Sequence, residues 1–352
     1  MAKAFLKTLL CAALFSISAA LFAQESAEPP AKPPRDALFE VGVPDFSASS
    51  YSKAVASLFK AFEKDWGHSI SKGKKGKVGI KVYTNSGPGI DTPKELVDAV
   101  IDQLEKRGYK KSDITIVDMS RRKLRECGFL PKYSELRAGK PDNYGGVNVA
   151  DIESRKFFDK NWFYDNPLTP KSVRGMTGIG ELYNPELRKS YLPVPLFLTV
   201  DFWINLPVIT DMEGLGVCAA LGNASIWNMS NNERFLKSPA NASMAAAEVC
   251  AIPELNGSHM FTILSLEKGQ FVGGAVFNSR CTFSEPKILL SANPVAVDFI
   301  AYELINKSRR AFGFSPIDPQ PPVLNYCKEL GVGDWDFRKI RRVNVPYSSK
   351  RQ

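Results

Sequence analysis

The chain has 352 residues, of which 44% are hydrophobic and 24% charged, and its formal net charge is +9. These proportions are near the averages for soluble globular proteins and exclude a disordered, a collagen-like or a multi-span membrane protein. The length suits one large domain or two domains of ordinary size.

The first 23 residues have the pattern of a secretory signal peptide. Lys3 and Lys7 form a short positive region, and residues 8–22 carry no charge. This apolar run is shorter than the roughly 20 residues that span a bilayer, and a polar, proline-rich stretch follows Ala23. We therefore predict bacterial export with cleavage after about Ala23, and a periplasmic or extracellular location. The alternative is an uncleaved membrane anchor.

Composition divides the rest of the chain into three parts. Residues 24–50 are rich in Pro, Ala and charged residues at their start, and we predict a tether that buries no core. Residues 51–337 carry strand and helix patterns and are predicted to form an α/β domain, with an irregular insert at about 120–195. Residues 338–352 contain repeated Arg and Lys and are predicted to be a basic tail.

The first predicted elements of the domain form a strand–helix–strand unit. Apolar residues at i, i+3, i+4 and i+7 predict an amphipathic helix over 51–66, and VGIKVY predicts a strand over 78–83. A helix over 92–108 and a strand over 113–118 follow. Two strands with a helix between them predict a βαβ unit with a right-handed crossover.

The start of the second helix has a clear sequence signature. Thr92 is expected to be the cap, Pro93 occupies the first helical position, and Glu95 completes a capping box.

The second half of the domain continues the same alternation. The run over 196–206 is almost entirely apolar, which predicts a central strand covered on both faces. Further predicted elements are a short buried helix over 214–221, strands over 260–266 and 288–290, a helix from Asn293-Pro294 to about Asn306, and a last helix over 323–330. The expected fold is three-layer α/β with a mostly parallel central sheet.

Cysteine and histidine spacing argues against the common metal and cofactor sites. There is no CxxC motif, and the two histidines, His68 and His259, have no Cys, Asp or Glu at ligand spacing. Phosphate-binding and dinucleotide glycine motifs are also absent. We therefore predict no metal, no iron–sulfur cluster and no other cofactor. Five cysteines follow the signal peptide, so at most two disulfides form, and their pairing is open: Cys127, Cys218, Cys250, Cys281 and Cys327.

Basic clusters occur over 72–77, 121–125, 307–310 and 338–342. Such clusters bind phosphate or nucleic acid in some proteins. These are scattered and lack interleaved aromatic residues, so solvated surface is favoured and nucleic acid is not expected as a partner. A basic protein is nevertheless attracted to anionic surfaces of the cell envelope, so we expect peripheral contact with them.

The segment around residue 205 carries the main candidate ligand site. The apolar strand holds Asp201 and Asn205 and stops at Pro207. Open α/β sheets bind ligands beyond the carboxyl ends of their strands. Gly214 and Gly216 precede a predicted helix, and their backbone N–H groups are expected to approach an anion. The alternative is that Asp201 and Asn205 only cap loops.

The same segment, VDFWINLPVITDMEGLGVCAALGNASI, resembles the central motif of the domain of unknown function 362 family. FVGG, which ends in Gly273-Gly274, resembles a Gly-Gly-Pro segment of that family, and SANPVAVD at 291–298 resembles its Ser-x-Asp-Pro-Val-Ala-x-Asp segment. The βαβ unit with Lys81 and the strand ending in Asp118 also fit, so the resemblance covers about residues 77–333. It adds ligand-binding candidates at Asn223, Gly273, Gly274 and Asn293, and acid–base candidates, should the protein be an enzyme, at Lys81, Asp211 and Asp298.

Departures from the family pattern bear on function. Thr210-Asp211-Met212 stands where the family has Lys-x-His, Gly222 stands where a Lys precedes Asn223, and Asn293 replaces an Asp. These losses favour binding over catalysis. The expected function is therefore an exported protein that binds a small polar or anionic ligand at the sheet edge.

Two other function classes stay open. One is a non-catalytic cell-envelope interaction protein, and the other is a hydrolase or oxidoreductase of unknown substrate. An enzyme should bring Lys81, Asp201, Asn205 and Asp211 together in one concave site.

Overall fold

The computed structural model describes residues 32–168, 185–236 and 239–347. A compact unit begins at Pro33. The predicted signal peptide and its cleavage site lie outside the described residues. No helix in the described ranges is both long and apolar enough to cross a membrane.

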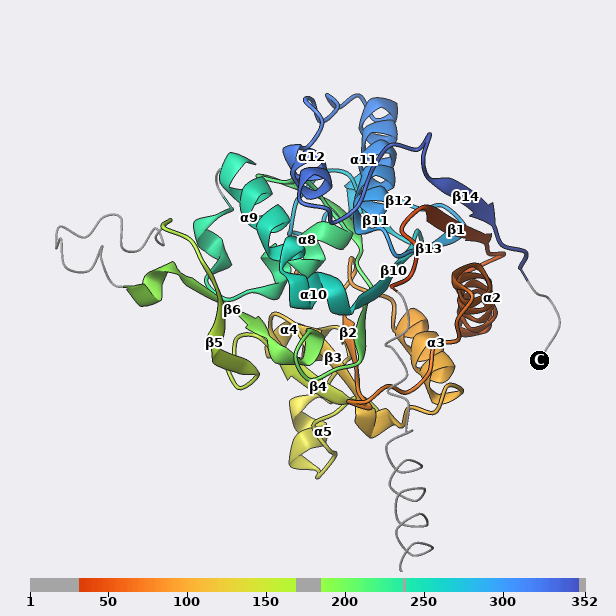
Figure 1. Ribbon diagram of the computed structural model, residues 1–352, viewed down its shortest axis with the longest axis vertical. Helices are drawn as coiled ribbons and strands as arrows, with labels where there is room; N and C mark the ends of the chain where they lie inside the picture. The colour runs from red at the N-terminus through yellow and green to blue at the C-terminus, as the bar shows by residue number, and fades with distance from the viewer. Residues whose placement is uncertain (1–31, 169–184, 237–238, 348–352) are drawn as a thin grey trace, which may run out of the picture. The chain divides into compact units, whose positions relative to one another are not determined.

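An eight-stranded mixed sheet forms the centre of this unit (Figure 1). Every neighbouring pair is parallel except those of one strand, β13, which runs antiparallel to both of its neighbours. The predicted α/β class with a mostly parallel sheet is therefore confirmed. In order across the sheet, the strands are β14 (Arg341–Asn344), β1 (Ala37–Gly42), β13 (Lys287–Ser291), β10 (His259–Ser265), β7 (Phe202–Asn205), β2 (Val78–Lys81), β3 (Ile114–Asp118) and β4 (Asn148–Asp151).

One face of the sheet is covered by α2 (Ala48–Trp66) and α3 (Lys94–Glu105). The apolar spacing that predicted the first helix is buried here, with Leu58 and Phe59 fully covered. This helix begins earlier than predicted because the Ser47 hydroxyl caps it, accepting a hydrogen bond from Ser50 N.

The other face is covered by five helices, which lie on the opposite side of the strands from α2 and α3 in Figure 1. They are α8 (Ala220–Ala224), α9 (Pro239–Ala251), α10 (Pro253–Ser258), α11 (Pro294–Ala311) and α12 (Pro322–Glu329). The predicted Asn-Pro start of α11 is confirmed, since the Asn293 side chain accepts hydrogen bonds from Val295 N and Ala296 N, each at 3.1 Å.

Both ends of the domain extend further than the sequence predicted. Ala37–Gly42, within the predicted tether, forms β1 and is almost entirely buried between β13 and β14. Arg341–Asn344, within the predicted basic tail, forms β14 and pairs in parallel with β1. Neither strand was predicted from composition, because the short apolar run ALFEV follows proline-rich residues and the tail strand RRVN lies among basic ones.

The predicted irregular insert is also partly wrong. It contains the sheet strand β4, which has only four residues and so shows little period-2 pattern. The same region holds α4 (Arg121–Glu126), α5 (Tyr133–Arg137) and a two-stranded antiparallel sheet of β5 (Phe158–Asp165) and β6 (Lys189–Pro193).

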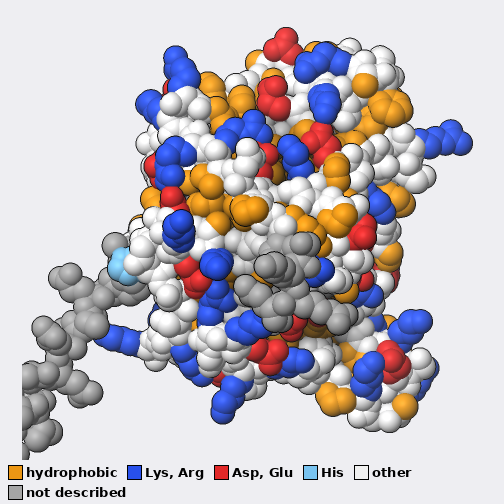
Figure 2. Space-filling model, turned by 90° about the vertical axis from the view of Figure 1, so that its right-hand side faces the viewer, with side chains coloured by type: hydrophobic (Ala, Val, Ile, Leu, Met, Phe, Trp, Pro, Cys, Tyr) orange, Lys and Arg blue, Asp and Glu red, His pale blue; other side chains and the backbone are white. Residues whose placement is uncertain are grey.

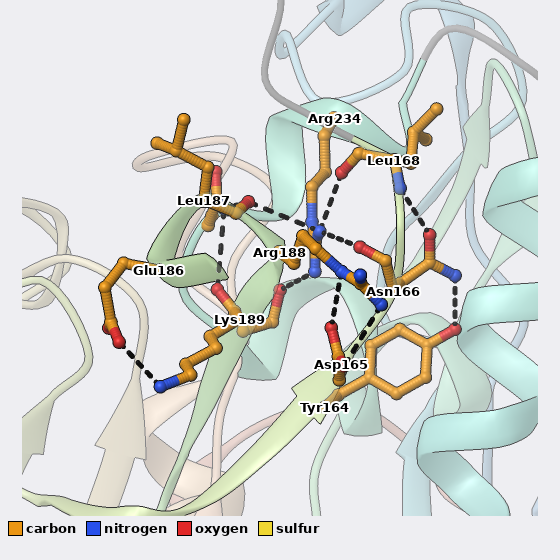
Figure 3. Close-up of polar contacts among 11 residues, drawn as sticks. Tyr164, Asp165, Asn166, Leu168, Glu186, Leu187, Arg188, Lys189 and Arg234 are labelled. Atoms are coloured by element: carbon orange, nitrogen blue, oxygen red, sulfur yellow. Dashed lines mark hydrogen bonds and ion pairs between the residues drawn. The ribbon is translucent and has the colours of Figure 1, made fainter. Parts of the chain in front are cut away.

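Arg234 anchors the β5–β6 hairpin to the body of the domain (Figure 3). Its buried guanidinium donates to the carbonyls of Asn166 and Leu168, at 2.8 and 2.7 Å, and to Ser190 Oγ at 2.9 Å. Burial lowers the pKa of Arg234 to about 10. The carbonyl of Leu187 accepts from the same guanidinium at 3.4 Å, so backbone dipoles beside both strands hold the charge. Arg234 forms no ion pair with the described residues.

A second, four-stranded sheet follows the carboxyl ends of β7 and β10. It contains β8 (Ile209–Met212), β9 (Gly216–Cys218), β11 (Gly269–Gln270) and β12 (Thr282–Phe283). The predicted helix over 214–221 is wrong for its first half. Gly214 lies in the turn between β8 and β9, and Gly216 begins β9, both with positive φ, 92° and 75°.

The apolar run over 196–206 is a strand only from Phe202 onward. Val194–Leu196 forms a 3₁₀ turn instead, and Leu196 and Phe197 pack into the core on the side of α8–α12.

The predicted capping box at α3 is wrong. Thr92 Oγ1 accepts a hydrogen bond from Tyr83 N at 2.8 Å and donates one to the Leu206 carbonyl at 2.6 Å. Pro93 occupies the cap position, with no side-chain cap. The Thr92 hydroxyl thus links the backbone just beyond the end of β2 to the backbone just beyond the end of β7.

Candidate functional site

A buried ion pair lies at the carboxyl ends of β2 and β3. Lys81 ends β2, and its Nζ lies 2.6 Å from Asp118 Oδ1 at the end of β3. Both side chains are completely buried. Burial lowers the pKa of Lys81, and the charge of Asp118 opposes that shift. The other carboxylate oxygen, Oδ2, accepts hydrogen bonds from Thr84 N and Thr84 Oγ1, both at 2.6 Å.

Two amide side chains extend this ion pair into a network across three parallel strands. Lys81 Nζ donates to Asn223 Oδ1 at 3.0 Å, and Asn223 Nδ2 donates to Asn205 Oδ1 at 2.8 Å. Asn205 ends β7 directly opposite Lys81, and its Nδ2 donates to the Ala220 carbonyl at 2.8 Å. The predicted place of Asn205, at the carboxyl end of a central parallel strand, is confirmed.

A small cavity adjoins the network at Asn205. Its volume is about 20 Å³, which is room for about one water molecule. The lining residues are Trp203, Asn205, Ala224, Cys250, Leu255, Asn256, His259, Pro294 and Val332. Arg35 bridges two of them, because its guanidinium donates to Asn256 Oδ1 and to the Val332 carbonyl.

His259 supplies the aromatic wall of this cavity together with Trp203. The two ring centroids are 4.7 Å apart. Burial lowers the pKa of His259 to about 3, and the nearby Arg35 adds to that effect, so the imidazole is neutral at pH 7. The polar groups at the cavity are therefore neutral, and the cationic guanidinium of Arg35 is beside them.

Asp298, an acid–base candidate, belongs to α11, and its side chain contacts the start of α8. Its Oδ1 accepts from Leu221 N at 3.1 Å, while Oδ2 is buried without a hydrogen-bond partner in the described part of the chain. Burial raises the pKa of Asp298 to about 7. Cys218, also fully buried, lies within electrostatic range of both Asp298 and Lys81.

Asp211 lies outside the network, on β8 of the small sheet. It accepts hydrogen bonds from Gly274 N at 2.8 Å and Gly273 N at 3.3 Å, and Arg309 lies 3.9 Å away. Three predicted residues are thus together, but the N–H groups of Gly273 and Gly274, two of the ligand-binding candidates, are occupied by the Asp211 carboxylate.

Asp201 was placed at the wrong edge of the sheet. It precedes β7, and its carboxylate accepts from Gly73 N, Lys75 N and Tyr109 OH, at 3.0, 2.7 and 3.2 Å. Asp201 directly precedes the four-residue strand β7 and Asn205 is its last residue, so the two lie at opposite ends of the strand. Asp201 therefore holds a loop, which was the alternative for this residue.

Three other candidates have structural roles. A Cβ on Gly214 would lie 3.1 Å from the Leu236 carbonyl oxygen, and one on Gly216 would lie 2.9 Å from Pro321 Cγ. The Asn293 side chain caps α11 and donates to the carbonyls of Arg35 and Asp334. Its capping satisfies the helix N–H groups that were expected to face a ligand.

The departure from the family pattern at Gly222 has a steric reason. A Cβ at this position would lie 2.4 Å from Cys218 Sγ, so a lysine has no room there. The cation beside Asn223 comes instead from Lys81.

Sequence reasoning missed several members of this region. Asp118 was noticed only as the end of a strand, and Thr84, Asn256 and His259 were not assigned. The signal for Asp118 was available, because Lys81 and Asp118 are the charged residues that end two adjacent apolar strands. The cavity had no such signal, since it combines residues from five separate segments.

No group of three or more His, Cys, Asp or Glu side chains that could hold a metal ion is found in the described ranges. The five cysteines of the described ranges are all buried thiols. The absence of a cofactor stays a prediction.

Comparisons with known proteins give no family for the chain. No protein-family model matches it, and no curated protein matches it. The crystal structure of a Thermotoga maritima protein, determined by the Northeast Structural Genomics Consortium, is similar at 12% identity and a TM-score of 0.33, over 62% of this chain and 50% of that one. The chain thus spans about half the length of that protein.

Proposed function

We propose that the protein is an exported member of the domain of unknown function 362 family and binds a small polar or anionic ligand at the carboxyl edge of its central sheet. The order of the family-like segments supports membership, and the N-terminal pattern supports export. The observation that carries the binding proposal is the buried network of Lys81, Asp118, Asn223 and Asn205 across three neighbouring strands.

The cost of this network supports a functional role. A fully buried ammonium and carboxylate lose several kcal/mol each of hydration, and an apolar pair is often at least as stable. Such groups cluster at functional sites. The network also lies at the strand ends where open α/β sheets bind ligands.

The cavity beside Asn205 has room for about one water molecule, so the proposed ligand places only a small group in it. It offers the amides of Asn205 and Asn256, the neutral imidazole of His259 and the neighbouring guanidinium of Arg35. These groups suit a hydrogen-bonding ligand that is neutral or carries one negative charge.

The positions of the acid–base candidates favour binding over catalysis. Lys81 is saturated by Asp118, Asn223 and the Val82 carbonyl. Asp211 is committed to Gly273 and Gly274 on another sheet. Of the four residues that an enzyme was expected to bring together, only Lys81 and Asn205 belong to one network.

Native mass spectrometry of protein purified from its own compartment tests this proposal. The folded wild-type protein should carry extra mass from a retained small molecule. Asn205→Ala should lose that mass, whereas the matched variant Asp201→Asn, at the other end of the same strand, should keep it. Bare polypeptide mass for the folded wild type, or equal loss in both folded variants, would contradict the proposal.

A second candidate function, contact with an anionic envelope surface, is favoured by a basic groove. The groove has a volume of about 1040 Å³ and lies between α2, α3 and the end of β14. Its acidic residues are neutralised, because Glu63 pairs with Arg107 and Asp65 with Arg341. Lysines that make no ion pair with the described residues also line it: Lys53, Lys60, Lys64 and Lys106. Figure 2 shows Lys and Arg side chains spread over one face of the molecule, with acidic ones between them.

Sedimentation with vesicles tests this second function. The protein should bind phosphatidylglycerol vesicles and not phosphatidylcholine vesicles. Changing Lys53, Lys60 and Lys64 together to Glu should weaken binding at least tenfold. The matched change of Lys74, Lys77 and Lys160, which alters net charge equally, should weaken it much less. Equal loss in the two triple variants would show attraction by net charge and would exclude the groove as the contact surface.

A further inference from the structure

Two of the five buried cysteines are neighbours in space. Cys250 is near the end of α9 and Cys327 is in α12, and these helices pack against each other in the same core cluster. Both side chains are buried where the two helices meet, and interaction with the Cys250 thiol is the main cause that raises the pKa of Cys327. The Cys250 thiol also donates to the Leu221 carbonyl, at 3.6 Å.

The other thiols have different surroundings. Cys127 lies against Asp91, and Cys218 lies against Thr210 and Trp227. Cys281 belongs to the core cluster under the small sheet, apart from that of Cys250 and Cys327. Cys218 shares the core cluster of Cys250 and Cys327, but its thiol interacts with Trp227 and Thr210. Among the described cysteines, Cys250 and Cys327 are therefore the pair whose thiols interact with each other.

The small cavity distinguishes the two members of the pair. Cys250 lines it and is 5% exposed, whereas Cys327 is 0% exposed. When the helices separate, Cys250 is therefore the thiol that an oxidant reaches first.

We propose that Cys250 and Cys327 form a disulfide when the protein meets a small disulfide oxidant, and that Cys127, Cys218 and Cys281 remain thiols. The Cys250 thiolate attacks one sulfur of the oxidant and releases the first oxidant thiol. The Cys327 thiolate then attacks the Cys250 sulfur of this mixed disulfide and releases the second. The two cysteines lose two electrons and two protons, and the oxidant is reduced to two thiols.

Burial sets the conditions under which the reaction proceeds. Contact with Cys250 and loss of hydration raise the pKa of Cys327, so little thiolate is present in the closed fold. Exchange is therefore slow in the native state and fast while the helices are still assembling. The proposed export would place the folding chain in an oxidising compartment, where such bonds persist.

Refolding followed by peptide mapping tests the inference. Reduced, unfolded protein is refolded with a mixture of oxidised and reduced glutathione, alkylated under denaturing conditions, digested and analysed by mass spectrometry. We expect about one cross-link per chain, between the peptides of Cys250 and Cys327, with the other three cysteines alkylated. Alkylation of all five cysteines in the folded product, or a cross-link between any other pair, would overturn the inference.

Variants and a second reagent separate the two steps. When the fold is opened just far enough for Cys250 to react with dipyridyl disulfide, the wild-type protein should release two thiopyridones per chain. Cys327→Ala should release one from position 250 and keep the mixed disulfide. The matched variants Cys127→Ala and Cys281→Ala should form the cross-link as the wild type does. Because the wild-type peptide map decides without any variant, a variant that fails to fold does not weaken the test.

Discussion

At the scale of single residues, the pair of Lys81 and Asp118 is the most consequential feature. Removal of one partner leaves a buried charge without its counter-charge, which typically costs about 3–5 kcal/mol. We therefore expect Lys81→Met and Asp118→Asn each to lower the free energy of unfolding by about that amount. The double variant should lose much less than the sum, since it buries neither charge and the amide oxygen introduced by Asp118→Asn would still accept from Thr84.

Urea denaturation of the four proteins measures this coupling. The exposed pair of Glu135 and Lys140 is the matched control, because both side chains face solvent and their removal should have little effect. Additive losses for Lys81 and Asp118 would mean that the two charges do not stabilise each other.

Asp298 predicts a pH dependence of stability. Its pKa is raised by burial from 3.8 to about 7, so the folded protein holds this proton more tightly than the unfolded chain does. Between about pH 4 and 7 the unfolded state binds fewer protons, and stability falls as the pH rises, by up to about 1.4 kcal/mol per pH unit from this group. Asp298→Asn should remove that slope, and urea denaturation at pH 5 and pH 8 measures it. An unchanged slope would mean that Asp298 is ionised throughout this range.

Gly222 predicts a steric effect. Gly222→Ala should cost about 1–3 kcal/mol, because the new Cβ meets Cys218 Sγ. The cost should be smaller in a Cys218→Ala background, where the sulfur is absent. Gly42→Ala is the control, since its Cβ would have no neighbour closer than 4.0 Å. Thermal denaturation of these variants would contradict the steric account if Cys218→Ala gave no relief.

At the scale of elements, the β5–β6 hairpin depends on Arg234. Arg234→Met keeps much of the apolar stem but leaves the carbonyls of Asn166 and Leu168 without their donor, which should cost at least about 2 kcal/mol. Hydrogen exchange should become faster in 164–168 and 186–190 and stay slow in β3. The control Arg188→Met removes an exposed pair with Asp165 and should change little. Equal exchange in wild type and Arg234→Met would show that the hairpin is held by its apolar contacts alone.

Elements with a strong apolar period were predictable from the sequence. The helices α2, α3 and α11 and the strands β2, β3, β10 and β13 lie where their patterns indicated. Thr92 shows the limit of a local signature. Its sequence context is that of a helix cap, but its hydroxyl bonds instead to Tyr83 and Leu206, just beyond the ends of two strands. Likewise, β14 could not be predicted, since its pairing with β1 joins the two ends of the domain and leaves no local trace.

At the scale of the whole molecule, part of the candidate site followed from the sequence. Asn205 was placed correctly because Pro207 ends its strand. Lys81 was a candidate through the family resemblance, on a strand predicted to continue two residues beyond it. Asp201 was misplaced because the true strand is shorter than the apolar run around it. Asp118 and His259 were missed as site residues because only the parallel order of β3, β2, β7 and β10 brings them near Asn205.

The most direct test of the central claim is a high-resolution crystal structure of protein purified from its own compartment without chelators or exchange of small molecules. The proposal predicts non-protein electron density beside Asn205 and His259, in contact with the network that includes Lys81. A well-ordered cavity that holds only water, with a ligand instead in the groove along α2 or at the Asp201 edge, would contradict it.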